Sequence, residues 1–274
     1  MGMQINTNLA ANNTYRNLNA TQNDLSKSLE KLSSGLRINR AADDAAGLAI
    51  SEGLRSQVGG LTVAARNAQD GISVVQTAEG GLTEVHSILQ RVRDLAVQSG
   101  NDSNNADART AIQTEVTALT DELTRIGNST NFNGIDLLNS TDTLTFQVGA
   151  GSTAANDQIT VKLTDITAVA TAVGALKFDS SAEALTSIAA LDTQITAVST
   201  ARSELGAVQN RFEHSIASTN VAKENLTAAG SRIRDVDMAE EMVKYTRSNV
   251  LSQAGQAMLA QANQSTQGVL SLLR

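Results

Sequence analysis

A seven-residue repeat of apolar side chains constrains the fold of this chain more than any other feature of its sequence. The repeat consists of Leu191, Val198, Leu205, Phe212, Thr219, Leu226 and Ile233, with Thr219 as its one polar member. Such spacing keeps one stripe of an α-helix against a partner helix and winds the pair into a left-handed supercoil. The repeat therefore predicts a long helix that packs along another long helix.

A partner for that helix is predicted over residues 44–99, where apolar residues recur every three or four positions. The same spacing predicts a shorter helix over residues 106–126. The chain contains no proline to break these helices, and aromatic residues make up only 2% of it. Because few large rings suit a thin bundle better than a wide core, we expect a mainly α fold, a long antiparallel helical coiled-coil rod.

Between residues 141 and 178 the helical spacing gives way to strict alternation. Leu144, Phe146 and Val148 alternate with polar residues, and residues 159–163 do the same. Alternation is typical of a half-buried strand, and a loop rich in Gly, Ser and Ala joins the two runs. We predict a small β-hairpin region here, while residues 164–181 fit no single pattern.

Both ends of the chain are uncharged, although the whole chain carries a formal net charge of −7. Residues 1–15 and 248–273 contain no Asp, Glu, Lys or Arg, and helical spacing of apolar residues continues beside them. One interpretation is a low-complexity disordered tail. The other, which the retained spacing favours, is that the terminal helices form a coiled coil with each other and pack with further copies of the chain.

The second interpretation predicts an assembly and a division of the chain. A contact between copies that repeats head to tail without closing builds an open helical filament. The residues predicted to pack inside it are Leu18, Leu25, Leu32, Val243, Val250, Leu251 and Met258. The expected parts are a terminal helical domain (1–44 and 236–274), a helical rod domain (45–140 and 179–235) and the hairpin region within the rod (141–178).

The stretch LSSGLRINRAADDAAGLAI, from Leu32 to Ile50, predicts an elbow between two helices. Ser and Gly weaken the end of the first helix, and Asp43 and Asp44 are placed to cap the second. The same stretch resembles the N-terminal signature of bacterial flagellins. The other stretches that resemble the family are Ile5–Asn8, Gln90–Ser99, Asn131–Gly134 and Val250–Arg274. The resemblance covers residues 1–140 and 180–274, as in a short flagellin without large outer domains.

This resemblance implies a secreted structural subunit that polymerises into the extracellular bacterial flagellar filament for swimming motility. It implies as partners further copies of the chain, a flagellar export chaperone, and cap and hook-junction proteins. Residues 90–99 resemble the segment recognised by the Toll-like flagellin receptor of vertebrates. Arg91, Leu95 and Glu115 match the contacts with that receptor, on a face that the family also uses between subunits. The alternative is a flagellin-like hook–filament junction protein or a secreted adhesin.

No pattern in the sequence predicts catalysis, a cofactor or a metal site. The two histidines, His86 and His214, fall in different predicted helices without an acidic cluster, whereas a metal site needs three or four ligands. There is no cysteine and no nucleophile elbow. The negative net charge argues against a nucleic-acid partner, and no apolar stretch approaches the ~20 residues that span a bilayer. We therefore expect neither an enzyme nor a nucleic-acid-binding or membrane protein.

Overall fold

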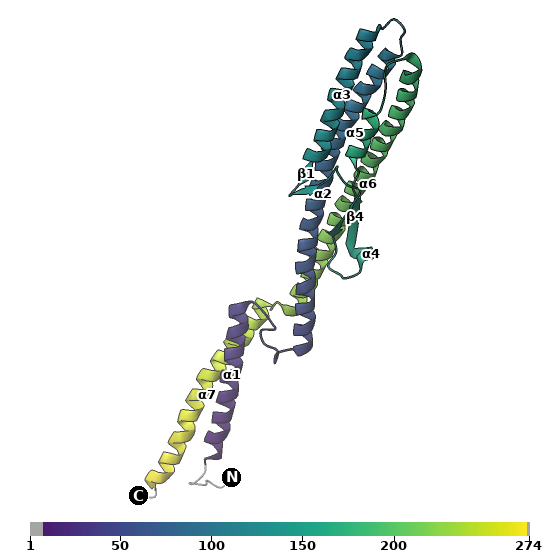
Figure 1. Ribbon diagram of the computed structural model, residues 1–274. Helices are drawn as coiled ribbons and strands as arrows, with labels where there is room; N and C mark the ends of the chain where they lie inside the picture. The colour runs from purple at the N-terminus through teal and green to yellow at the C-terminus, as the bar shows by residue number, and fades with distance from the viewer. Residues whose placement is uncertain (1–7, 273–274) are drawn as a thin grey trace. The chain divides into compact units, whose positions relative to one another are not determined.

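The computed structural model describes residues 8–272, and the side chains of residues 8–264. Long helices dominate it, with two pairs of short strands between them (Figure 1). The elements in chain order are α1 (Leu9–Ser34), α2 (Ala45–Ser99), α3 (Ala106–Ser129), β1 (Asn131–Phe132), β2 (Ile135–Asp136), β3 (Thr143–Gln147), α4 (Ala154–Asp157), β4 (Gln158–Lys162), α5 (Ile166–Gly174), α6 (Ser181–Arg234) and α7 (Met238–Leu272). The predicted mainly α fold is confirmed.

The chain divides into two compact units, which we call the terminal unit and the rod unit. The terminal unit comprises residues 1–56 and 225–274, of which 8–56 and 225–272 are described, and the rod unit comprises residues 57–224. Helices α2 and α6 contribute residues to both units. The predicted boundaries at residues 44, 140, 178 and 235 stay a prediction.

Two ion pairs show the relative direction of the two longest helices, α2 and α6, within the rod unit. Arg93 Nε of α2 lies 2.7 Å from Asp192 Oδ1 of α6, and Arg202 Nη2 of α6 lies 3.7 Å from Glu79 Oε1 of α2. Later residues of α2 therefore pair with earlier residues of α6, so the helices run antiparallel. This is the arrangement that the sequence predicts for the rod.

The heptad repeat of α6 faces the core of the rod unit. Its members Leu191, Val198 and Phe212 are fully buried and belong to one apolar cluster with residues of α2 and α3. The α2 members of that cluster include Val75, Leu82, Leu89 and Val92, each with no exposed surface. The stripe from the rod helix α2 thus meets the stripe from α6, as a coiled-coil seam requires.

The Phe212 ring sets the spacing between α2 and α6. A Cβ atom on Gly71 of α2 would lie 2.7 Å from Phe212 Cζ, closer than side-chain atoms pack. The ring also meets Phe146 edge to face, with centroids 5.5 Å apart and an interplanar angle of 90°. Glycine at position 71 therefore lets an aromatic side chain occupy the helix seam.

The predicted β-hairpin is present. Strands β3 and β4 pair antiparallel, with Thr143 opposite Lys162 and Gln147 opposite Gln158. The short helix α4 lies in the connection that the sequence predicts as a loop. A second, smaller pair, β1 and β2, closes over Asn133 and Gly134, which have φ angles of 50° and 79°. Two consecutive positive φ angles are typical of a type I′ hairpin turn, for which Asn-Gly is the preferred sequence.

The segment that fits no single pattern contains helix α5, which is buried on one face. Asp165 caps it, since its Oδ1 accepts hydrogen bonds from the amides of Thr167 (2.8 Å) and Ala168 (3.3 Å). Thr167 Oγ1 also donates to Asp165 Oδ1 at 2.6 Å, and this bond lowers the pKa of the carboxyl group. Helix α5 packs against α3, which completes the core of the rod unit.

The terminal unit is built on an antiparallel pair of helices, α1 and α7. Nδ2 of Asn8, the N-cap residue of α1, donates to Ala262 O of α7 at 3.0 Å. At the other end of the pair, the Val236 amide donates to Gly35 O at 3.0 Å. Gly35 ends α1 in a left-handed conformation, with φ 71°, and its amide donates to Lys31 O. The predicted pairing of the terminal helices is thus observed; Ile5–Thr7 lie outside the described residues.

The predicted elbow follows α1 and holds the start of α2. Asp44 caps α2, because its Oδ1 accepts a hydrogen bond from the Gly47 amide at 2.8 Å. Asp43 closes the preceding turn instead, accepting from the amides of Asn39 (3.1 Å) and Arg40 (2.9 Å). These backbone bonds, led by that of Arg40, lower the pKa of Asp43. Both carboxylates therefore act as caps and turn closers within the terminal unit.

Candidate assembly surface

Helix α7 has two faces of different character. The face toward α1 is narrow and partly polar: Ser252 and Glu241 are its buried members, and Gly255 brings the helix against Leu18 of α1. The opposite face is apolar and exposed. Its large residues and their exposed fractions are Val243 (59%), Val250 (58%), Leu251 (53%) and Met258 (62%). We call these four residues the outer face of α7.

A shallow apolar hollow lies on the outer face. Its lining comes from α7 alone and consists of Ala239, Met242, Val243, Thr246, Arg247, Val250 and Leu251. Arg247 is the last charged residue before Arg274, so the outer face continues from the hollow along an uncharged stretch of helix. An exposed apolar row of this kind on one helix is a candidate interaction surface.

The seven residues predicted for inner packing separate into two sets. Val243, Val250, Leu251 and Met258 lie on the outer face. Leu18, Leu25 and Leu32 are half-buried on α1, which packs against α7. A Cβ atom on Gly255 would lie 3.2 Å from Leu18 Cδ1, so Leu18 lies directly against α7. The sequence does not separate these sets, because both follow the same helical spacing.

The α1–α7 pair has few buried side chains. Ser28 is the buried residue of α1, and Ser252 and Glu241 are those of α7 within residues 238–264. Glu241 Oε2 lies 3.7 Å from Lys244 Nζ, which keeps its carboxylate paired. A helix pair whose buried side chains are polar gains little from the hydrophobic effect. The α1–α7 pair thus leaves the four apolar side chains of the outer face exposed.

The rod unit presents the three residues matched to the flagellin receptor. Arg91 Nε and Nη2 donate to Glu115 Oε1 at 2.9 and 2.7 Å, which joins α2 to α3 on an exposed surface. Leu95 is only 2% exposed and packs inside the rod unit. Its side chain therefore supports this surface from below, and Arg91 and Glu115 are the members that solvent reaches.

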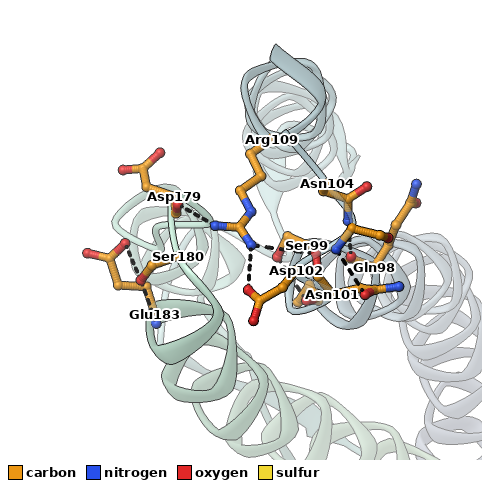
Figure 2. Close-up of polar contacts among 11 residues, drawn as sticks. Gln98, Ser99, Asn101, Asp102, Asn104, Arg109, Asp179, Ser180 and Glu183 are labelled. Atoms are coloured by element: carbon orange, nitrogen blue, oxygen red, sulfur yellow. Dashed lines mark hydrogen bonds and ion pairs between the residues drawn. The ribbon is translucent and has the colours of Figure 1, made fainter. Parts of the chain in front are cut away.

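A polar cluster closes one end of the rod unit, where α2, α3 and α6 begin or end (Figure 2). Arg109 Nη1 donates to Asp179 O at 2.9 Å, and its Nη2 lies 3.2 Å from Asp102 Oδ1. The side chain is only 15% exposed. Arg109 therefore ties the α2–α3 loop to the segment before α6. This role is not visible in the sequence, because an Arg in the first turn of a helix has no local pattern that identifies its partners.

The described residues offer no candidate metal site. Within 8–272 no group of three His, Cys, Asp or Glu side chains could hold a metal ion. His86 Nε2 lies 2.9 Å from Gln90 Nε2 on α2, and His214 is exposed on α6. No helix in the same range is long and apolar enough to cross a membrane. The exposed surfaces on α7 and on the rod unit remain as the candidate functional sites.

Two family models match the chain over most of its length. The bacterial flagellin N-terminal helical region matches residues 5–143, and the bacterial flagellin C-terminal helical region matches residues 188–273. The first match includes α1, α2 and α3, and the second includes most of α6 and all of α7. The helices of both units therefore carry the pattern of the family.

Curated relatives agree over whole chains. The flagellin of Halalkalibacterium halodurans is 55% identical over 99% of this chain and 100% of its own length, and that of Bacillus subtilis is 50% identical with the same coverage. Flagellin FlaB2 of Treponema pallidum is 46% identical over 99% of this chain and its own full length.

Solved structures support the fold. The crystal structure of Bacillus cereus flagellin is 33% identical, with a TM-score of 0.50 over 56% of this chain and 88% of its own. A putative flagellar hook-associated protein from Vibrio parahaemolyticus has a TM-score of 0.59 over 70% of this chain and 100% of its own, but at 15% identity it shows the fold alone. The chain belongs to the bacterial flagellins, non-enzymatic structural subunits of the extracellular flagellar filament.

Proposed function

We propose that this flagellin polymerises by covering the outer face of α7 with helices of neighbouring copies. The observation that carries the proposal is the exposure of Val243, Val250, Leu251 and Met258 on an otherwise well-formed helix. Each such side chain contributes on the order of 1 kcal/mol when its remaining exposed surface is buried. The row therefore supplies a driving force for assembly that a single chain leaves unused.

The absence of charge in α7 from residue 248 onward makes a second copy the fitting occupant. Residues 248–273 carry no Asp, Glu, Lys or Arg, so packing this segment against its own copies meets no charge repulsion. A buried unpaired charge would oppose such packing strongly. When the contact does not close on itself, it extends into a filament, as the family requires.

Within one subunit, Leu18, Leu25 and Leu32 have a different part in this proposal. They hold α1 against α7 and so present the outer face in a fixed orientation. Incorporation into the filament then adds the contacts that the pair lacks alone. The inner packing of the filament thus combines an intrachain seam at α1 with interchain contacts at α7.

Two exposed valines allow a matched test. Val250 on the outer face is 58% exposed, and Val221 on α6 of the rod unit is 60% exposed. Purified Val250→Asp and Val221→Asp chains are mixed with short filament seeds, and growth is measured by sedimentation and electron microscopy. We expect Val221→Asp to elongate the seeds and Val250→Asp to remain soluble. Equal elongation by Val250→Asp and the unaltered protein would contradict the proposal.

We propose further that the partners implied by the resemblance act on the terminal helices. An export chaperone that holds the C-terminal segment would cover the outer face before assembly, and cap and hook-junction proteins would meet it at the filament ends. The apolar hollow at Met242, Val243 and Val250 supports this proposal, because an uncovered hollow favours premature association. Binding of each partner should fall with Val250→Asp and persist with Val221→Asp, as measured by calorimetry.

We also propose that Arg91 and Glu115 form one surface with two uses: it contacts a neighbouring subunit in the filament and a Toll-like flagellin receptor when the subunit is free. Their ion pair is exposed, so the partner reaches both charges. Arg93 offers a control, because it makes a similar 2.7 Å pair with Asp192 on the α2–α6 side. Receptor binding, measured by surface plasmon resonance, should fall for Arg91→Glu and hold for Arg93→Glu. The opposite order would remove Arg91 from the contact.

A further inference from the structure

Every methionine with a described side chain lies on α7 and is exposed. Met238, Met242 and Met258 have 48%, 50% and 62% of their surface exposed. In most proteins methionine fills the core, and the rod unit contains none. Three of the five methionines of the chain therefore lie on the helix that we assign to assembly, and the other two, Met1 and Met3, lie outside the described residues.

Two of these methionines belong to the assembly surface, by which we mean the outer face of α7 together with the residues that line its apolar hollow. Met242 lines the apolar hollow beside Val243, and Met258 follows Leu251 by one seven-residue step on the outer face. Met238 does not line the hollow, although it is as exposed as Met242. Met238 therefore provides an internal comparison on the same helix.

The composition of the chain directs mild oxidants to these sulfur atoms. The chain has no cysteine and no tryptophan, so the thiol that peroxide would otherwise attack is absent. Hydrogen peroxide transfers one oxygen atom to a thioether: its O–O bond breaks, an S=O bond forms, sulfur loses two electrons and water leaves. The product, methionine sulfoxide, is polar and can be reduced back enzymatically.

We propose that Met242 and Met258 make the assembly surface sensitive to oxidation, so that peroxide converts free subunits into a form that cannot polymerise. This inference rests on the proposed role of the outer face. A sulfoxide oxygen buried against an apolar neighbour lacks a hydrogen-bond donor, which disfavours the contact. In the filament the same sulfur atoms are covered, so polymerisation protects them from the oxidant.

The test compares full-length chains that differ in which methionines remain. Subunits of the unaltered protein, of Met242→Leu/Met258→Leu and of Met238→Leu are treated with hydrogen peroxide, freed of it with catalase and added to filament seeds. Leucine has a similar volume and no oxidisable sulfur, so it keeps the surface apolar. Peptide mass spectrometry measures sulfoxide at each position.

We expect peroxide to raise the critical concentration for assembly about tenfold for the unaltered protein and for Met238→Leu, which corresponds to about 1.4 kcal/mol. The Met242→Leu/Met258→Leu chain should assemble equally well before and after treatment. Methionine sulfoxide reductases should restore assembly of the oxidised unaltered protein. Filaments treated in the same way should gain sulfoxide at Met242 and Met258 much more slowly than free subunits.

The inference fails if the oxidised unaltered protein, with sulfoxide at both positions, assembles at an unchanged critical concentration. It fails also if the Met242→Leu/Met258→Leu chain loses assembly as strongly as the unaltered protein. Both outcomes are separate from failure of the proposed function, which the untreated Val250→Asp chain reports without any oxidant.

Discussion

The rod unit and the terminal unit have the same helical spacing of apolar residues but differ in how many of those residues they bury. In the rod unit, Leu82 and Leu89 of α2 and Leu191 of α6 are fully buried within one chain. In the terminal unit, α1 buries only Ser28, and Val250 and Leu251 of α7 stay exposed. Helical spacing of apolar residues therefore indicates that a helix packs against a partner, but it does not indicate whether that partner belongs to the same chain.

The difference follows from the number of helices in each unit. Helices α2, α3, α5 and α6 surround one core in the rod unit, so each apolar stripe meets another. In the terminal unit α7 packs on α1 with one face only. A two-helix pair can cover only one side of each helix, so the second apolar side of α7 stays uncovered in a single chain, and this is the side on which we propose that other copies pack.

The sharpest contrast between the units comes from two matched leucines. Leu89→Ala should destabilise the rod unit by about 2–5 kcal/mol, because it opens a cavity in a packed core. Leu251→Ala should change the free energy of unfolding of the free subunit by less than about 0.5 kcal/mol. Chemical denaturation followed by circular dichroism measures both. Similar losses for the two variants would mean that the outer face is already covered within one chain.

Removing the Arg109 hydrogen bonds tests how much they stabilise the end of the rod unit where the α2–α3 loop lies. Replacing Arg109 with Met removes the hydrogen bonds to Asp179 O and Asp102 and should cost about 1.5–3 kcal/mol. Hydrogen exchange should become faster in the loop over residues 100–105 and unchanged over residues 238–264. Unaltered exchange at the loop would show that packing alone closes this end.

Two glycines of α2 compare a position that faces Phe212 of α6 with a position that faces open space. Gly71→Ala should destabilise the rod unit by about 1–3 kcal/mol, because the new Cβ meets the Phe212 ring at 2.7 Å. Gly80→Ala meets no atom within 4 Å and should stabilise it by about 0.5–1 kcal/mol through helix propensity. Thermal unfolding curves compare the two. Stabilisation by both changes would mean that Phe212 moves aside freely.

The smallest expected effect is a pH dependence confined to the rod unit. The hydroxyl of Thr167 lowers the pKa of Asp165 below its ordinary value of 3.8. A lowered pKa in the folded state adds stability above the unfolded value, and that stability is lost as pH falls below about 4. Asp165→Asn keeps a capping side chain but does not titrate there, so its unfolding free energy should vary less between pH 5 and pH 2. Identical acid dependence in both proteins would assign the effect to other carboxylates.

Much of the rod unit follows from local sequence. The repeat from Leu191 to Phe212 predicts the buried stripe of α6, and alternation at Leu144 and Phe146 predicts strand β3. Helix α5 is harder to predict, because it is short and its Ala and Thr residues give little contrast between its two faces. Its buried residues Ile166, Val169, Ala170 and Val173 do follow helical spacing, and the packing of α5 against α3 makes that spacing clear.

The candidate assembly surface is only partly predictable. Sequence identifies Leu18, Val243 and Val250 as apolar positions of helical period, and the structure then assigns Leu18 to the intrachain seam and the valines to the outer face. The distinction depends on which face of α7 packs against α1. Gly255 and the buried Ser252 lie on that face, and no local sequence pattern encodes this tertiary contact. Arg109 was missed for the same reason, since its partner Asp179 lies far away in sequence.

The central claim is that the rod unit is complete within one chain and that α7 is completed by other copies. Hydrogen exchange on free subunits and on filaments tests it directly, with residues 72–96 of α2 compared with residues 238–264 of α7. We predict that α2 is strongly protected in both states and that α7 is strongly protected only in the filament. Protection of α7 in the free subunit equal to that in the filament would contradict the claim.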